Sequence, residues 1–475
     1  MSLSGEGFDN VDQEKIPAIG RWLSAATVAF ERVADVTASE QVLDRLQALL
    51  ANEHRCSAGE REHQERDNPL SRWKVLKYTL ATAMLGGMLL SPRLWVSSRS
   101  YPLAPVWDGL PTVTAPWDRV VFGGLIAALV AVIVAPRPRL AMMIFVVLAM
   151  VWSLWDQTRW QPWFYQYLVM FVVLAGGPSP GDAERSQASL NACRLIVAGV
   201  YFWSGLQKLN VLFATDVYPW LMEPVLKHLS GEWHEYVRGS GCEAALLECA
   251  IGLGLLVWPL RLLAMVGAVI MHLLILFNLG PWGHDWNSVV WPWNVAMMVF
   301  VVVLFARTRH VRPWNILWPR RCLVGRLALV LFGIMPLFNF FECWDSYLSV
   351  ALYSGNTPME RVYINQEVYD HLPTKVRTAY VSRRMGAALD DPCPYEVDSF
   401  NWALEEMNVP NYPAERVSRA FARRMAKLPE KAPSTNVQDV PLIEGRPGVR
   451  VILILQGRAD WLTGVRREKY VVFPE

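Results

Sequence analysis

Residues 262–279 read LLAMVGAVIMHLLILFNL, an apolar stretch interrupted by one imidazole, His272. A membrane-spanning helix needs about 20 mostly apolar residues to cross a hydrocarbon core of roughly 30 Å. The sequence therefore predicts a polytopic α-helical membrane protein with about nine transmembrane helices, or eight if one of the two shortest stretches, 119–135 or 163–176, does not cross. The other predicted spans are 73–93, 119–135, 140–157, 163–176, 192–209, 244–260, 289–306 and 323–341.

The composition supports this class. The chain has 475 residues and a formal net charge of +2, with 53% hydrophobic and 19% charged residues. Soluble domains carry roughly 25% charged residues. The near-zero net charge argues against a nucleic-acid partner, which would require a basic excess. Seven cysteines are ordinary usage and exclude a disulfide scaffold. Membrane lipid is the expected surrounding.

The distribution of positive charge predicts the orientation. Lys and Arg gather in alternate loops, as at Arg137 and Arg139, whereas loop 210–243 is rich in acidic residues. Cytoplasmic loops are enriched in Lys and Arg, so the N-terminus is expected in the cytoplasm and the C-terminus in the periplasm of a bacterial inner membrane. Most of the tryptophans fall on the outer side, and 213–229 is predicted to lie on the outer leaflet.

Three parts are expected along the chain. Residues 1–72 form a cytoplasmic amphipathic helical region, with two helices in 12–54. Residues 73–341 form the transmembrane domain. Residues 342–475 form a small extracytoplasmic α/β domain, in which periodicity predicts helices near 397–408 and 414–427 and strands at 449–455 and 470–473.

Cys343 and Cys393 both fall in this outer part of the chain. A disulfide can form and persist in an oxidising compartment. Two readings stay open: a bridge between these two cysteines, or two unpaired thiols.

Ionisable residues inside membrane spans are costly and mark candidate functional sites. Lys208 ends one predicted span and shares a helix face with Tyr201 and Ser204, because these positions are spaced i, i+3 and i+7. Glu248 and His272 lie in later spans. Each has a simpler alternative: Lys208 as a side chain reaching to the interface, Glu248 as a structural partner, and His272 as a hydrogen-bonded core residue.

The polar residues near the spans fall mostly in the outer half, which favours a cavity open to that side over a channel or a transporter. With no HExxH motif and no clustered ligand set, no metal site is expected. The further polar residues that follow this trend are Asp156, Arg159, Gln161, Gln166, His284, Asp285, Asn287 and Asn294.

Residues 204–210 read SGLQKLN, and residues 271–277 read MHLLILF. The first string resembles the Gly-x-Lys-Lys-Leu-Asp type string of the vitamin K-dependent γ-carboxylase family, whose bacterial transmembrane part is called the horizontally transferred transmembrane (HTTM) domain. The second resembles a later span of that family that contains a histidine. Lys208 falls on the family's second Lys, whereas Gln207 stands in place of the first Lys and Asn210 in place of the Asp.

The resemblance implies an enzyme in which Lys208 is the base that deprotonates a quinol, a vitamin K-like cofactor or substrate. The outer part of this chain is far smaller than the family's substrate-docking region, so the expected substrate is a quinol or another lipid-like molecule in the outer leaflet. The small redox-associated DoxX-type membrane proteins carry a similar Gly-x-x-Lys string. A DoxX-like or non-catalytic membrane subunit that binds a protein partner through 342–475 is therefore the alternative. The candidate site comprises catalytic Lys208, Glu248 and His272, and substrate-binding Tyr201, Ser204, Trp291 and Asn294.

Overall fold

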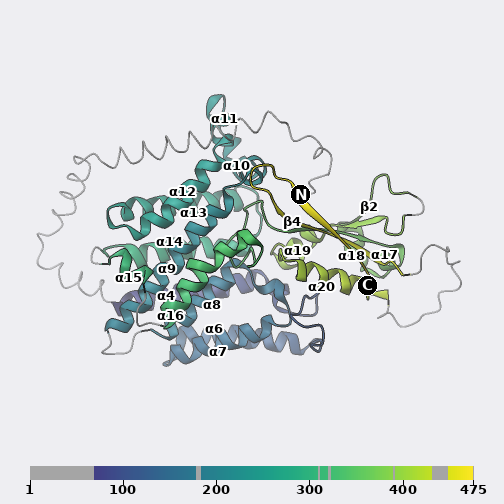
Figure 1. Cartoon of the computed structure of the whole chain (residues 1–475). Helices are drawn as coiled ribbons and strands as arrows, with labels where there is room; N and C mark the ends of the chain where they lie inside the picture. Colours follow the sequence, from purple (N-terminus) through teal and green to yellow (C-terminus); the bar gives the residue numbers. More distant parts are fainter. Residues whose placement is uncertain are drawn as a thin grey trace, which may run out of the picture.

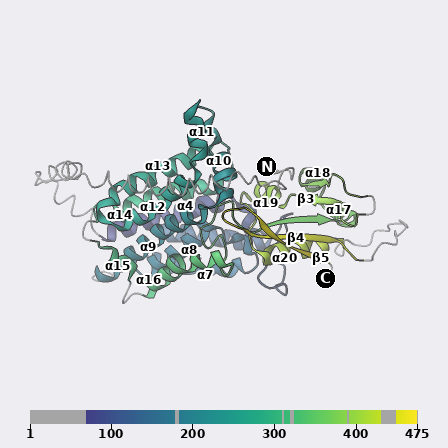
Figure 2. The ribbon, with the colours of Figure 1, turned by 45° about the horizontal axis from the view of Figure 1, so that its top comes forward.

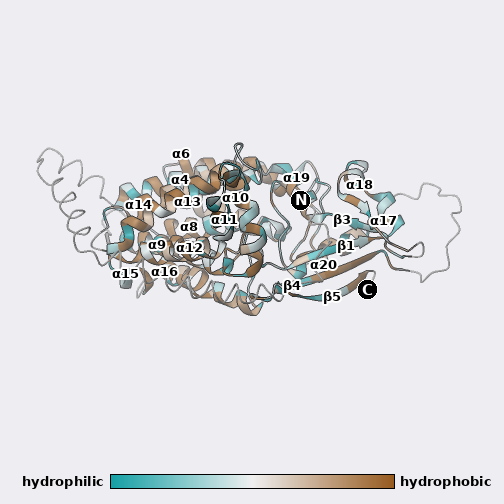
Figure 3. Ribbon diagram, turned by 90° about the horizontal axis from the view of Figure 1, so that it is seen from above, coloured by the Kyte–Doolittle hydropathy of each residue, from teal (hydrophilic) through white to brown (hydrophobic). Residues whose placement is uncertain are grey.

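Helices form one end of the molecule and a small sheet forms the other (Figure 1). The protein is seen in a computed structural model that describes residues 69–177, 183–308, 311–318, 323–388, 391–429 and 448–473. The helices predicted within 12–54 lie outside these residues. Viewed from above, the helical body is mostly hydrophobic, whereas hydrophilic residues are more frequent in the sheet end (Figure 3).

All nine apolar stretches of the sequence are helical. The ninth is a continuous run composed of α16 (Leu323–Ala328), η6 (Leu329–Ile334) and η7 (Met335–Phe341). The other eight are α4 (Pro69–Leu90), α6 (Trp117–Val134), α7 (Pro138–Ser153), α8 (Pro162–Ala175), α9 (Ala183–Lys208), α12 (Gly241–Leu256), α13 (Arg261–Leu279) and α14 (Trp291–Phe305).

Helix length and apolar content together decide which of these stretches qualify as membrane spans. Among the described residues four helices are long and apolar enough to cross a membrane, or up to six if two bent pairs each count as one span. The four are Trp117–Val134, Trp258–Leu279, Ser288–Phe305 and Leu323–Phe341. The expected nine spans are not confirmed: α7 and α8 have only 16 and 14 residues, and α4, with 22 residues, is not among the helices that qualify. In an α-helix, at 1.5 Å per residue, α7 and α8 are shorter than the hydrocarbon core.

One bent pair interrupts the helical body after α9. The chain turns by 93° between α9 and the run Phe213–Leu226, which comprises η3 (Phe213–Val217) and α10 (Tyr218–Leu226). Helix α11 (Glu232–Gly239) follows and projects sideways from the body (Figure 2). The stretch predicted to lie on the outer leaflet, 213–229, is thus mostly helical and runs across the direction of α9.

The sheet is antiparallel and has the strand order β2-β3-β1-β4-β5. Its strands are β1 (Met359–Ile364), β2 (Val381–Arg383), β3 (Tyr395–Val397), β4 (Val451–Ala459) and β5 (Arg466–Phe473). In β4, Val451, Leu453 and Leu455 are buried at every second position, as expected for one face of a strand. The helices predicted near 397–408 and 414–427 are confirmed as α19 (Ser399–Met407) and α20 (Glu415–Ala426).

The sheet end is joined to the helical body by a continuous core, since one hydrophobic cluster runs from α4 to β5. Polar contacts add to this junction: the Asn408 amide donates to the Ser288 hydroxyl at 2.8 Å and to the Leu90 carbonyl at 3.0 Å. Cys343 is an exposed free thiol and Cys393 a buried one. Of the two readings left open by the sequence, the disulfide is therefore wrong.

Candidate functional site

The site centres on the last two turns of α9. Tyr201, Ser204 and Lys208 share one face of this helix, as their spacing predicts. The Lys208 ammonium donates to the Ser204 hydroxyl at 2.8 Å and to the Glu248 carboxylate at 2.7 Å. The two charged side chains are only 14% and 11% exposed. Lys208 is thus held in place by one carboxylate and one hydroxyl.

Glycines allow α9 and α12 to approach closely enough for this pair to form. A Cβ at Gly205 in α9 would lie 2.6 Å from the Ala245 carbonyl and from the Cys249 amide in α12. A Cβ at Gly252 in α12 would lie 2.6 Å from the Phe202 amide in α9. Small residues let membrane helices pack backbone to backbone. The glycines therefore set the distance across which Lys208 meets its carboxylate.

A second polar group lies one to two turns further into the body and crosses three helices. The Tyr201 hydroxyl lies 2.6 Å from His272 Nε2, and His272 Nδ1 lies 2.7 Å from Asn294 Oδ1. The amide of Asn294 donates to the Val290 carbonyl at 2.9 Å, so its oxygen faces the ring. This arrangement assigns the proton of a neutral imidazole to Nδ1 and leaves Nε2 to accept from Tyr201.

Trp291 takes a different position from the other predicted site residues. Its indole donates to the Leu279 carbonyl at 3.1 Å, which joins the start of α14 to the end of α13. The structure therefore brings together six of the seven predicted residues in two groups. Lys208, Glu248 and Ser204 form the ion-pair group, and Tyr201, His272 and Asn294 form the hydrogen-bonded chain beside it.

The turn between β4 and β5 lies across the end of α9. The Arg458 guanidinium donates to Gln207 Oε1 at 3.0 Å, and the Val211 amide donates to the Trp461 carbonyl at 3.0 Å. Burial lowers the pKa of Arg458 to about 10. The Asn210 amide donates to the Ser354 carbonyl at 2.9 Å. The sheet end thus packs on the C-terminal end of α9, next to the residues that carry the ion pair.

Sequence reasoning missed this contact between the sheet end and α9, although two of the residues that form it stand out in the sequence. Gln207 and Asn210 are the positions that depart from the γ-carboxylase-type string. Both are buried and both bind the segment after residue 342. Lys208 is the position at which the string agrees with the γ-carboxylase type. Gln207 and Asn210, at which it differs, form the hydrogen bonds to the segment after residue 342.

Two of the other polar residues of the predicted trend, Asp156 and Arg159, have structural roles. Asp156 accepts from Arg99 at 2.6 Å and from the Ala104 amide at 3.2 Å. Burial alone would raise the pKa of Asp156, but the cations of Arg99 and Arg159 and the surrounding hydrogen bonds hold it below its usual value. Arg159 donates to main-chain carbonyls, including that of Leu94 at 3.1 Å. These groups fix the loops at the sheet-facing end of α7 and α8.

Comparison of this chain with protein-family models, with curated proteins and with solved structures finds no match.

Proposed function

We propose that this protein is an integral-membrane enzyme that takes a proton from an acidic, lipid-soluble substrate such as a quinol, with Lys208 as the base. The observation that carries the proposal is the position of Lys208. Its nitrogen lies 2.7 Å from Glu248 at the end of α9, and the residues just after it contact the turn between β4 and β5. A buried ion pair is a costly arrangement, which makes a functional role the default hypothesis.

The proposed step is a single proton transfer. The O–H bond of the substrate breaks, and its proton passes to the Lys208 nitrogen. Lys208 must first be neutral, and Glu248 is the adjacent group that can hold the proton of its ammonium form. The ammonium that results then lies beside the substrate oxyanion. Packing of the sheet end on the end of α9 would keep water from the site, which would strengthen the attraction between the Lys208 ammonium and the substrate oxyanion.

The second polar group supports the site without touching the transferred proton. His272 and Asn294 hold the Tyr201 hydroxyl in one orientation, so they act as positioning residues. Tyr201 and Ser204 lie on the face of α9 that carries Lys208, where they would contact the substrate. The proposed enzyme is like the γ-carboxylases only in its lysine base, and it does not carboxylate a peptide.

The proposed setting is a bacterial inner membrane. We propose that α4, α7 and α8 and both bent pairs join the four long helices to give nine spans, with the N-terminus in the cytoplasm and the sheet end in the periplasm. The alternation of Lys and Arg between loops supports this orientation. The substrate would then enter from the outer leaflet.

The test is the rate of acylation of Lys208 in nanodiscs, measured by mass spectrometry across a pH series with and without a reduced quinone. Lys227 is the matched control, because it also pairs with a glutamate, at 3.2 Å, but is 66% exposed. Quinol should slow acylation of Lys208 and leave Lys227 unchanged. The Glu248→Gln variant should change the pH profile of Lys208 alone. Equal rates at Lys208 with and without quinol would refute the proposal.

A second candidate function is a membrane subunit that binds a protein partner through the sheet end. The observation that favours it is the edge strand β5, whose Tyr470 and Val472 are 64% and 42% exposed. An exposed edge offers unpaired main-chain groups to another strand. Under this function Lys208→Met would leave activity intact, whereas Val472→Pro would abolish partner binding. The reverse pattern favours the enzyme.

A further inference from the structure

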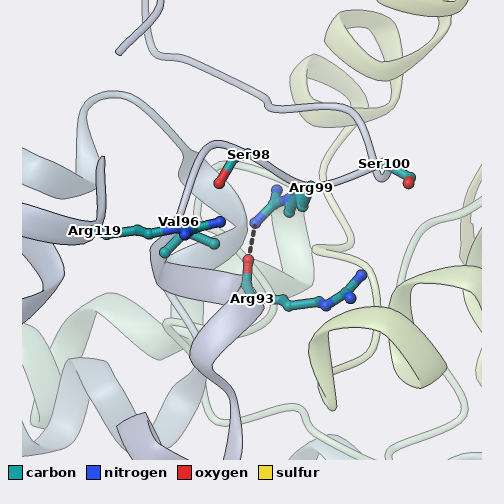
Figure 4. A pocket seen from close by; sticks show the side chains of 6 residues that line it. All are labelled: Arg93, Val96, Ser98, Arg99, Ser100 and Arg119. Carbon is teal, nitrogen blue, oxygen red and sulfur yellow. Dashed lines mark hydrogen bonds between the residues drawn. The ribbon is translucent and has the colours of Figure 1, made fainter. Parts of the chain in front are cut away.

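The loop that joins α4 to α6 forms a cationic hollow at the sheet-facing end of the helical body. Its volume is about 450 Å³, and it lies beside the short helix α5 (Pro92–Trp95). Arg119 reaches it from α6 on one side, where Val96 is also seen, and Arg93 lies on the other (Figure 4). The residues that line it are Arg93, Val96, Ser98, Arg99, Ser100 and Arg119.

Two of the three arginines keep charge available for a ligand. Arg99 is fully committed, because it donates to Asp156 and to the carbonyls of Tyr101, Arg93 and Leu94. Arg119 is exposed, and its side chain makes no hydrogen bond or ion pair within the part of the chain that the structure describes.

Arg93 is 62% exposed and meets a single carboxylate, Glu406, at 3.2 Å. That carboxylate already accepts from the main-chain amides of Ser100 and Tyr101 at 2.7 and 2.8 Å. It also accepts from the Trp402 indole at 2.8 Å. An ionised carboxylate offers about four acceptor sites, so Glu406 does not depend on Arg93.

A second carboxylate beside the hollow, that of Asp118, is also satisfied by the protein. Asp118 is buried and accepts from the Ser97 and Ser98 amides and the Ser98 hydroxyl at 2.7 to 3.0 Å. It therefore shapes the loop beneath the hollow. The exposed hydroxyl of Ser100 and the guanidinium groups of Arg93 and Arg119 are left to face a ligand.

An apolar surface runs from the hollow along α6. This helix lies at the edge of the helical body, since only 22% of its residues are buried. Val120, Val130 and Val134 are exposed on it, and a Cβ at Gly123 or Gly124 would meet nothing within 4 Å. These positions repeat at helical spacing and form one smooth stripe that ends at Arg119. Trp117, next to Arg119, is 66% exposed, which suits a membrane–water interface.

From this combination we infer that the hollow binds the phosphate group of an anionic phospholipid, whose acyl chain lies along the α6 stripe. Arginine binds phosphate oxygens through paired N–H groups, and two arginines on opposite sides of the hollow can hold one phosphate. A soluble phosphate ester offers the same head-group chemistry. The stripe favours the lipid, because it provides apolar surface on α6 that begins directly after Arg119, which lines the hollow. This site is independent of the proposed reaction at Lys208.

The test is a native mass spectrometry titration of the purified full-length protein with phosphatidylglycerol, phosphatidylcholine, glycerol 3-phosphate and inorganic phosphate. The wild type should bind one phosphatidylglycerol with an affinity at least about tenfold above that of the Arg93→Gln/Arg119→Gln double variant, because charge-assisted hydrogen bonds are lost. The Arg93→Lys/Arg119→Lys variant should recover part of this affinity. The Arg383→Gln/Arg467→Gln variant removes two exposed charges from the sheet and should behave as the wild type.

A second variant tests the acyl-chain contact. Gly124→Phe fills the stripe and leaves both arginines in place, so it should weaken phosphatidylglycerol and leave glycerol 3-phosphate unchanged. Equal affinity of the wild type and the Arg93→Gln/Arg119→Gln variant for phosphatidylglycerol would overturn the inference. Glycerol 3-phosphate binding as tightly as phosphatidylglycerol would overturn the lipid assignment.

Discussion

Replacing Gly205 with alanine tests whether the contact between α9 and α12 holds the Lys208–Glu248 pair together. The new Cβ would lie 2.6 Å from two backbone atoms of α12, short of ordinary contact by about 0.8 Å. Neither backbone atom can rotate away, so the helices must separate. Overpacking of this kind costs roughly 1–3 kcal/mol.

The separation also weakens the ion pair. Opening the 2.7 Å contact by the same distance costs about 1 kcal/mol by Coulomb's law at an effective dielectric constant of about 20. Gly205→Ala should therefore lower the free energy of unfolding by about 2 to 4 kcal/mol. The measurement is unfolding of the purified protein by SDS in mixed micelles, followed by circular dichroism, together with acylation of Lys208, which should become faster.

Gly124→Ala is the matched control. It is the same substitution in a membrane helix, at a position where the Cβ meets nothing within 4 Å. Removing glycine from a helix interior is neutral or stabilises it by up to about 1 kcal/mol. If the Gly205 and Gly124 variants unfold alike and acylate Lys208 at the wild-type rate, close packing does not set the geometry of the site.

Three further predictions follow from groups outside the membrane helices. A membrane-impermeant maleimide applied to right-side-out vesicles at pH 8 should label exposed Cys343 and spare Cys393, whose pKa burial raises to about 12; labelling in inverted vesicles alone would reverse the proposed orientation. Asp156→Asn should cost about 3–5 kcal/mol, because it leaves the cation of Arg99 unpaired in a fully buried pair. Since the folded pKa of this carboxyl is lowered from 3.8, the wild type should keep this stability above pH 3.8 and lose it as the pH falls further, and denaturant titrations of the variant should lack that loss. Arg458→Ala removes the hydrogen bond to Gln207, so it should loosen the packing of the β4–β5 turn on α9 and speed acylation of Lys208. An unchanged rate would mean that this turn does not shield Lys208.

The sequence predicted the helices, whereas the number of spans stays a prediction beyond the four to six that length and apolar content support. Apolar content identifies a helix that avoids water, and all nine stretches are helical. Crossing depends on length, and length depends on where proline and loop residues end the helix. Helices α7 and α8 begin at Pro138 and Pro162 and end after 16 and 14 residues. The 93° turn after α9 could not be read from apolar content, because the residues on both sides of it are apolar.

The same contrast holds for the candidate site. Helical spacing placed Tyr201, Ser204 and Lys208 on one face, because three residues within one helix fix their own geometry. The contact between Lys208 and Glu248, which are forty residues apart, depends on how α9 and α12 pack. That packing depends on Gly205 and Gly252, whose close contacts are known only from the structure. Whether Cys343 and Cys393 form a disulfide could not be decided from the sequence for a related reason. Their positions in the chain do not give the distance between them, and in the structure Cys343 is exposed and Cys393 is buried.

The residues at the end of α9 form two sets of contacts on two faces of the helix. Ser204 and Lys208 face Glu248, whereas Gln207 and Asn210 face the segment after residue 342. A lysine at position 207, as in the γ-carboxylase-type string, would point a cation at the Arg458 guanidinium across a distance now bridged by a 3.0 Å hydrogen bond. Like charges so close repel when both are partly buried. The amide at this position therefore allows the sheet end to pack directly on the helix that carries the proposed base.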